Sequence, residues 1–206
     1  MKSYGFIPSL ITPATIRYKA SQSKPLPERF SYRPFLSPVT NQGDYPFCIP
    51  HSVACWLNWR ENMKKGTKKD FNIKYADIYY SKNSSGSGMT YMDAFDFLKK
   101  KGVKSDKGKL KISTVAYIPN MTWLKAAIIA NGPCFGALPV YDPDSNTFWK
   151  RTGSKLQGWH SITIVGWNEK GYIIRNSWGV GYGDKGYEVV PYEEESSFKE
   201  LWTILG

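Results

Sequence analysis

The sequence predicts an α+β protein of two lobes, because helical patterns come first along the chain and short strand patterns follow them. The chain has 206 residues, of which 41% are hydrophobic and 16% aromatic, so it can bury a sizeable core. This composition is typical of a globular protein. No apolar run approaches the roughly 18 residues that a membrane span needs, so we expect no membrane partner.

Residues 1–25 come first, and they are polar, interrupted by Pro8 and Pro13, and without periodicity. We expect an N-terminal extension that lies on the fold or hangs off it. The prolines also make this segment a poor secretory signal.

The first predicted helix begins at or near Cys48. Pro50 is compatible with this start, because the first turn of a helix tolerates proline. Gly66 is a plausible stop. The helix would carry one apolar stripe at i, i+4, i+7 and i+10, formed by Ile49, Val53, Trp56 and Trp59.

Two further amphipathic helices are predicted before the strands begin. The segment 88–102 is closed by Gly102. The segment 120–133 is capped by Asn120 or Thr122 and is stopped by a Gly-Pro pair.

Four β-rich runs separated by Gly, Asn and Asp follow: "CFGALPVYD", "HSITIVGW", "GYIIRNSW" and "GYEVVPY". If the turn at 168–171 closes a hairpin, His160 and Asn176 lie toward its open end, within a few residues of register. A histidine beside an amide suits a cysteine nucleophile, because the imidazole takes the thiol proton and the amide carbonyl orients the ring. The alternative is a strand-end histidine without a catalytic role.

The net charge of +11 invites a nucleic-acid interpretation, and lysines cluster at 63–70 and 98–111. We interpret these clusters as solvated helix ends and loops. Zinc-finger spacing, an aromatic RNP pattern and a glycine-rich phosphate loop are all lacking, so we do not expect nucleic acid as a partner. A basic surface could equally attract acidic peptide substrates.

The three cysteines are an odd number without tight spacing, which argues against a disulfide framework and for a reducing, cytoplasmic compartment. His51 and Cys55 would share a helix face with Cys48. A zinc site needs four ligands, however, and the only other Cys or His residues are Cys134 and His160. We therefore expect no metal and no cofactor, with His51 as a packed helix residue and Cys55 as a core residue.

Three segments, "PVTNQGDYPFCIPHSVACW", "GWHSITIVGW" and "IIRNSWGVGYGDKGY", resemble the papain-like cysteine peptidases in their order and content. "WLKAAIIANGP" and "VPYEEESSFKELWTI" look most like the prokaryotic branch. The resemblance covers residues 26–206. It implies a helical lobe at about 40–112 containing the nucleophile helix. It also implies an antiparallel β-barrel-like lobe at about 113–206 plus 26–39, which contains the His and Asn, and an active-site cleft between the lobes.

The resemblance implies Cys48 as nucleophile, His160 as its partner and Asn176 as the residue that orients His160. Gln42 would donate to the oxyanion with the backbone N–H of Cys48, and Trp178 would shield the His-Asn bond. A cysteine at a helix N-terminus beside an imidazolium can have a pKa several units below about 8.5.

The segment "SGSGMTYMDAFDFLKKKGV" resembles the glycine-containing groove segment of the family. Gly86, Ser87 and Gly88 would present backbone to an extended peptide substrate, and Trp178 is also expected to contribute to substrate binding. The loop before the nucleophile departs from the family, because Pro46-Phe47 stand where small residues are usual. No subsite preference is therefore transferred.

The extension carries the apolar stretch "YGFIPSLI", which motivates the hypothesis that it lies in the groove as a short pro-peptide. The resemblance implies a cysteine peptidase that needs no cofactor. An acyl- or peptidyl-transferase would use the same residues. A non-enzymatic basic binding protein on a peptidase fold is the alternative from another class.

Overall fold

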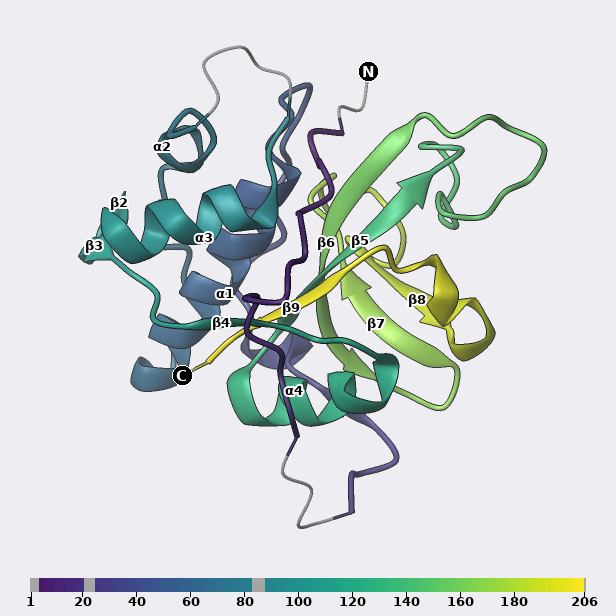
Figure 1. Ribbon diagram of the computed structural model, residues 1–206, viewed down its shortest axis with the longest axis horizontal. Helices are drawn as coiled ribbons and strands as arrows, with labels where there is room; N and C mark the ends of the chain where they lie inside the picture. Colours follow the sequence, from purple (N-terminus) through teal and green to yellow (C-terminus); the bar gives the residue numbers. More distant parts are fainter. Residues whose placement is uncertain (1–3, 21–24, 83–87, 206) are drawn as a thin grey trace.

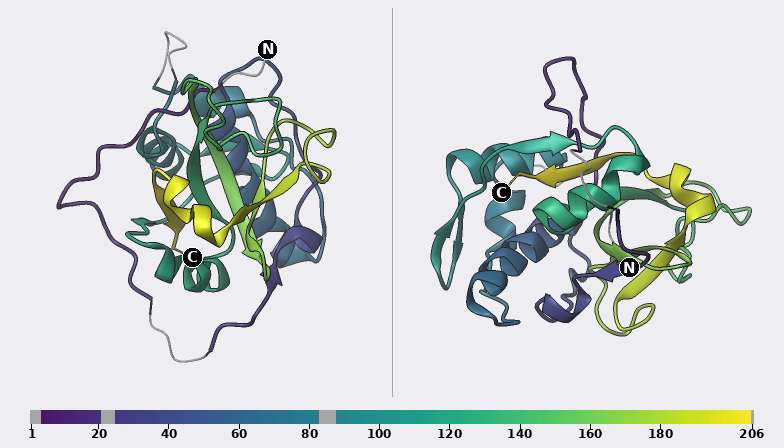
Figure 2. Two further views of the ribbon diagram at one scale, coloured as in Figure 1. Left: turned by 90° about the vertical axis from the view of Figure 1, so that its right-hand side faces the viewer. Right: turned by 90° about the horizontal axis from the view of Figure 1, so that it is seen from below.

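The computed structural model describes residues 4–20, 25–82 and 88–205, which form a helical part and a β-sheet lying side by side (Figure 1; Figure 2, right). The helical part holds three helices and a small antiparallel hairpin: α1 (Cys48–Lys65), α2 (Tyr75–Tyr79), α3 (Tyr91–Lys100), β2 (Val103–Ser105) and β3 (Gly108–Leu110). The predicted α+β fold of two lobes is confirmed.

The sheet is antiparallel throughout, with the strand order β4-β9-β5-β6-β7-β8, and β1 pairs with β6. Its strands are β1 (Phe30–Ser31), β4 (Val115–Tyr117), β5 (Cys134–Val140), β6 (Gly158–Trp167), β7 (Gly171–Arg175), β8 (Tyr187–Pro191) and β9 (Leu201–Ile204). Within the described ranges β4 and β8 are the two ends of the order, so the sheet is open rather than a closed barrel. Helix α4 (Leu124–Asn131) packs against it.

Helix α1 lies between the two hydrophobic cores, because Ile49 packs in the core of the helical part and Cys55 packs in the core of the sheet. The predicted stripe is buried except for Trp59, which is half-buried. The helix ends at Gly66, whose φ of 62° is the left-handed conformation that glycine adopts readily. Burial on both sides fixes the position of Cys48 at the start of α1.

The other two predicted helices are shorter than expected. Helix α3 begins only at Tyr91, because Thr90 and Asp93 form a reciprocal capping box. The segment predicted from residue 120 starts with a 3₁₀ turn, Met121–Trp123, and becomes α-helical at Leu124. The predicted cap by Asn120 or Thr122 is wrong, since no side-chain capping bond forms at either start.

A buried polar network joins the two parts beside the start of α1. The Tyr91 hydroxyl lies 2.7 Å from the Gly136 carbonyl and 2.6 Å from the Ser161 hydroxyl, which in turn donates to Ser52 Oγ at 2.9 Å. Leaving such a buried group unpaired costs about 1–3 kcal/mol. The network therefore stabilises the contact of α1 and α3 with β6.

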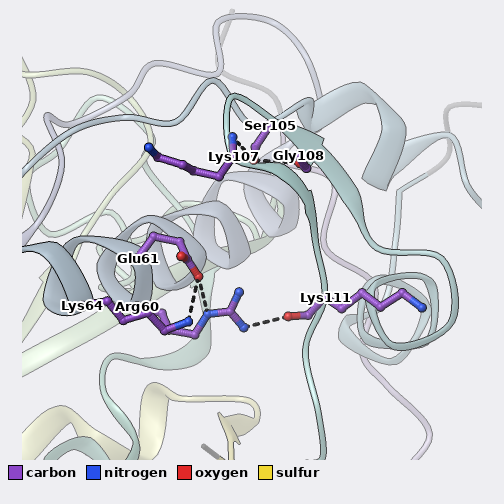
Figure 3. A network of polar contacts seen from close by, with 7 residues as sticks. All are labelled: Arg60, Glu61, Lys64, Ser105, Lys107, Gly108 and Lys111. Atoms are coloured by element: carbon purple, nitrogen blue, oxygen red, sulfur yellow. Dashed lines mark hydrogen bonds and ion pairs between the residues drawn. The ribbon is translucent and has the colours of Figure 1, made fainter.

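Glu61, near the end of α1, forms ion pairs with Arg60 and Lys64 on the lysine-rich side of the helical part (Figure 3). Its carboxylate accepts from Arg60 Nε at 2.9 Å and lies 3.3 Å from Lys64 Nζ, while Arg60 also donates to the Lys111 carbonyl at 2.7 Å. Burial alone would raise the pKa of Glu61, but the hydrogen bonds from Arg60 and Lys64 outweigh it and the pKa is lowered.

We expect Glu61→Gln to lower the free energy of unfolding by about 0.5–1 kcal/mol at pH 7. Because the folded-state pKa is lowered, this stabilisation is present above the unfolded pKa of about 4.3 and is lost as pH falls through the folded value. Urea unfolding at pH 7, 5 and 3 measures the difference, with the exposed Glu169→Gln as control. A difference between wild type and Glu61→Gln that stays constant down to pH 3 would contradict this assignment.

Candidate active site

Cys48 is the first residue of α1 and is fully buried, at 0% exposure. Backbone groups of Ser161 and Gly5 lie near enough to its sulfur to lower the thiol pKa, which places the thiol against β6 and beneath the extension. Burial raises the pKa of the Cys48 thiol, and these backbone hydrogen bonds only partly oppose it. The lowered pKa expected from the sequence therefore does not apply while the extension covers the thiol.

His160 and Asn176 come together from the hairpin of β6 and β7, with His160 Nε2 2.8 Å from Asn176 Oδ1. Asn168 and Gly171 close this hairpin at the predicted turn. Trp178 stacks on the imidazole with 4.3 Å between ring centroids and an interplanar angle of 25°. Both members of the pair are at most 2% exposed, so water is largely excluded from their hydrogen bond.

Gln42 lies on the loop before α1 and is held by the segment that follows Asn176. Its backbone N–H donates to the Ser177 carbonyl at 2.8 Å, and its Oε1 accepts from Ser177 Oγ at 2.6 Å. One N–H of its side-chain amide donates to the Tyr45 carbonyl at 2.9 Å. These bonds bring Gln42 to the same side of the fold as Cys48 and Asn176.

His51 is directed away from this site. Its Nδ1 lies 2.7 Å from Thr40 Oγ1, and its ring stacks on Tyr75 at 4.0 Å between centroids. Burial, followed by the positive charges of Arg175 and His160, lowers the pKa of His51 to about 3, so it stays neutral. The interpretation of His51 as a packed helix residue is confirmed.

Metal ligation finds no support in the geometry. Within the part of the chain that the structure describes, no three His, Cys, Asp or Glu residues are placed to hold a metal ion. The three cysteines are free and buried. No helix among the described residues is long and apolar enough to cross a membrane.

The groove segment is only partly visible, since Gly86 and Ser87 lie outside the described residues. Gly88 has a φ of +108°, and a Cβ added to it would lie 2.9 Å from the Gly5 carbonyl oxygen, so the close approach requires glycine. Its N–H donates to the Tyr79 hydroxyl at 3.0 Å. Met89, which the sequence analysis did not single out, is the residue whose backbone N–H and carbonyl both bond to another segment of the chain.

The extension runs along this segment, down the front of the molecule between the helices and the sheet (Figure 1, dark purple). The Met89 N–H donates to the Gly5 carbonyl at 2.7 Å, and the Ile7 N–H donates to the Met89 carbonyl at 2.8 Å. Phe6 between them is 6% exposed and packs edge-on against Tyr91. The extension thus covers both Met89 and the Cys48 thiol.

A buried thiol at a helix N-terminus, beside a histidine held by an asparagine amide, defines the class of cysteine hydrolases with a Cys-His-Asn site. The model of the papain family cysteine proteases matches residues 39–199, and the chain belongs to this family.

The curated relatives are cysteine proteinases. The gut-specific cysteine proteinase of Caenorhabditis elegans is 36% identical over 83 residues, which cover 37% of this chain and 25% of the relative. Cysteine proteinase 3 of Entamoeba histolytica is 25% identical over 204 residues, covering 85% of this chain and 66% of the relative. The chain spans about a quarter of the length of the first relatives it matches.

Solved structures share the whole fold. Xylellain, a cysteine protease from Xylella fastidiosa, superposes with a TM-score of 0.84 at 22% identity, covering 99% of this chain and 96% of that one. Procathepsin B S9 from Trypanosoma congolense gives 0.80 at 15% identity, covering 98% and 85%. At these identities the likeness concerns the fold.

Proposed function

We propose that this protein is a cysteine peptidase in which Cys48 attacks peptide carbonyls and His160 is its acid-base partner. His160 takes the thiol proton, the thiolate adds to the carbonyl carbon, and His160 protonates the leaving amine as the C–N bond breaks. Water then hydrolyses the acyl-enzyme and releases the free acid. The observation that carries the proposal is the 2.8 Å contact of His160 Nε2 with Asn176 Oδ1 beside the Cys48 helix.

The oxyanion of the tetrahedral intermediate would accept from the backbone N–H of Cys48 and from the Gln42 side-chain amide. Each such donor contributes roughly 3–4 kcal/mol to lowering the barrier. Trp178, stacked on His160, would keep water from the His-Asn hydrogen bond. We assign substrate backbone binding to Gly86, Ser87 and Gly88, extended by Met89.

Residues 1–25 are proposed to act as a short pro-peptide on a peptidase domain at 26–206, whose lobes divide near residues 40 and 112. The pairing of residues 5–7 with Met89 supports this role, because it uses the backbone groups that a substrate would use. The buried Glu200 contributes by accepting from the Ser9 N–H at 3.0 Å.

Three finer expectations remain predictions. The preference for acidic substrates rests on the net charge of +11 alone. A cytoplasmic location rests on the three free cysteines, which a reducing compartment preserves. An acyl- or peptidyl-transferase would use the same residues, and products formed with added amine nucleophiles would distinguish it from a hydrolase.

The test of the proposal is the alkylation rate of each cysteine by iodoacetamide between pH 4 and 9, read by peptide mass spectrometry on protein lacking residues 1–24. We expect Cys48 to react fast below pH 6. Cys55 and Cys134 should lag, because burial raises their pKa, that of Cys134 to about 12.

His160→Ala should abolish the advantage of Cys48. If Cys48 alkylates no faster than the other two cysteines, there is no thiolate-imidazolium pair. The non-enzymatic binding protein then takes precedence. A salt-dependent affinity for nucleic acid that Cys48→Ala leaves unchanged would support it.

A further inference from the structure

Both the oxygen and the nitrogen of the Asn176 side-chain amide form hydrogen bonds: the oxygen accepts from N–H groups, and the nitrogen donates to a carboxylate. Its Oδ1 accepts from His160 Nε2 at 2.8 Å and from the Ser177 backbone N–H at 2.7 Å. Its Nδ2 donates to Glu188 Oε1 at 3.4 Å. Asn176 is 2% exposed and Glu188 8%, so the chain from imidazole to carboxylate is buried along its length.

Two of these partners fix the orientation of the amide. A backbone N–H can only donate, and an ionised carboxylate can only accept. Rotating the Asn176 amide by half a turn would place two donors together at Ser177 and two acceptors together at Glu188. With Oδ1 fixed toward His160, Nε2 of the ring must carry the proton in the neutral form, and Nδ1 is the nitrogen that exchanges a proton with a thiol.

Glu188 is itself held in place by the sheet and by the loop that follows Trp178. Its backbone lies in β8 opposite Ile174 of β7. Gly183, with a φ of +56°, lies so close that a Cβ there would be 3.0 Å from Glu188 Cγ and 2.5 Å from the Tyr187 carbonyl oxygen. The residue also lines a surface pocket of about 410 Å³, together with Arg33 and Asp184.

We propose that Glu188 is a positioning residue: its carboxylate locks the Asn176 amide toward His160, and its charge favours the imidazolium form of that histidine. The charge acts over two hydrogen bonds in a buried environment, where an opposite charge stabilises the ionised form. Burial of a glutamate in a strand costs desolvation free energy, and a role in positioning Asn176 gives a reason for a glutamate at this place.

Other ionisable groups lie near Glu188 and His160, and their charges also influence how these two residues respond to pH. Tyr182 faces Glu188, and burial together with that carboxylate raises the pKa of the phenol. Arg33 and Asp184 pair with each other across the pocket at 2.6 Å. His51 on α1 lies near enough to His160 for the charge of one ring to affect the other, although its own ring bonds to Thr40 and stacks on Tyr75.

The test compares Glu188→Leu and Glu188→Gln with the exposed Glu193→Gln as a charge-matched control. Glu188→Leu removes both the acceptor and the charge. We therefore expect kcat to fall roughly ten- to a hundredfold, with KM within about twofold, which is the size of effect found when an outer partner that fixes the orientation of a histidine is lost. Glu188→Gln keeps an acceptor but loses the charge. It should recover most of kcat, while the alkaline limit of kcat/KM moves to lower pH.

The kinetic measurements rest on the proposed function, so a second readout is independent of it. The chain has two histidines, and nitrogen NMR of their rings reports tautomer and protonation, with His51 as internal reference. In both variants the protonation midpoint of His160 should move to lower pH while His51 stays in place. An unmoved His160 midpoint in Glu188→Gln, or a Glu188→Leu protein with unchanged kcat and tautomer, would overturn the role of Glu188. Absence of hydrolysis by wild type would overturn only the peptidase.

Discussion

His160→Ala should lower the rate of peptide hydrolysis by roughly 10⁴-fold or more, which is the size of effect seen when a member of a nucleophile-base pair is lost. His51→Asn should leave the rate within about twofold of wild type. The two histidines lie on neighbouring elements, but only His160 has an amide partner and a place beside the Cys48 helix. His51 is neutral and bonded to Thr40, and asparagine keeps an acceptor for that hydroxyl.

The measurement is initial-rate hydrolysis of a fluorogenic peptide library by protein lacking residues 1–24, with circular dichroism to show that each variant is folded. Cys48→Ala and Cys55→Ala form the corresponding pair for the nucleophile. Cys55 is buried and free, so its loss creates only a small cavity, costing about 1 kcal/mol of stability. Equal losses in His51→Asn and His160→Ala would mean that the base has been assigned wrongly.

The positions of Cys48, His160 and Asn176 in the fold could be predicted from sequence because each lies on or beside an element with a strong local signal, whereas Gln42 and Trp178 were expected only from the family resemblance. The apolar stripe and Gly66 define α1, so Cys48 falls at a helix start. The hairpin turn at 168–171 sets the approach of His160 and Asn176, and a β-bulge between Ile164 and Gly166 adjusts the register by one residue.

The residues that contact the candidate site from other elements, Glu188 and Met89, had no local sequence pattern that could predict their contacts. Glu188 lies in a strand of otherwise apolar residues, and its contact with Asn176 depends on the pairing of β8 with β7. Met89 pairs with residues more than eighty positions earlier, through a single parallel bridge that no periodicity announces. Strands as short as β4 and β9 escaped prediction because their pairing with each other joins distant parts of the chain.

Deleting residues 1–24 should raise turnover on peptides by roughly tenfold or more. Burying Phe6 contributes about 2 kcal/mol, and the two backbone hydrogen bonds to Met89 about 1 kcal/mol each, so the covered state is strongly favoured. Uncovering the thiol also removes the burial that raises the pKa of Cys48, so alkylation and hydrolysis should both increase. Steady-state kinetics of the full and shortened chains measures the effect.

Truncation alone is ambiguous, because Tyr18 also pairs with Tyr117 of β4 and its loss affects the sheet edge. Gly5→Ala separates the two effects. A Cβ on Gly5 would lie 2.2 Å from the Pro46 carbonyl oxygen, so residues 4–7 must leave the groove while the rest of the extension stays paired. Gly181→Ala is the matched control, since its Cβ meets no atom within 4 Å. A pro-peptide requires Gly5→Ala to match the shortened chain in turnover. If both have the kinetics of the full chain, the extension does not block substrate.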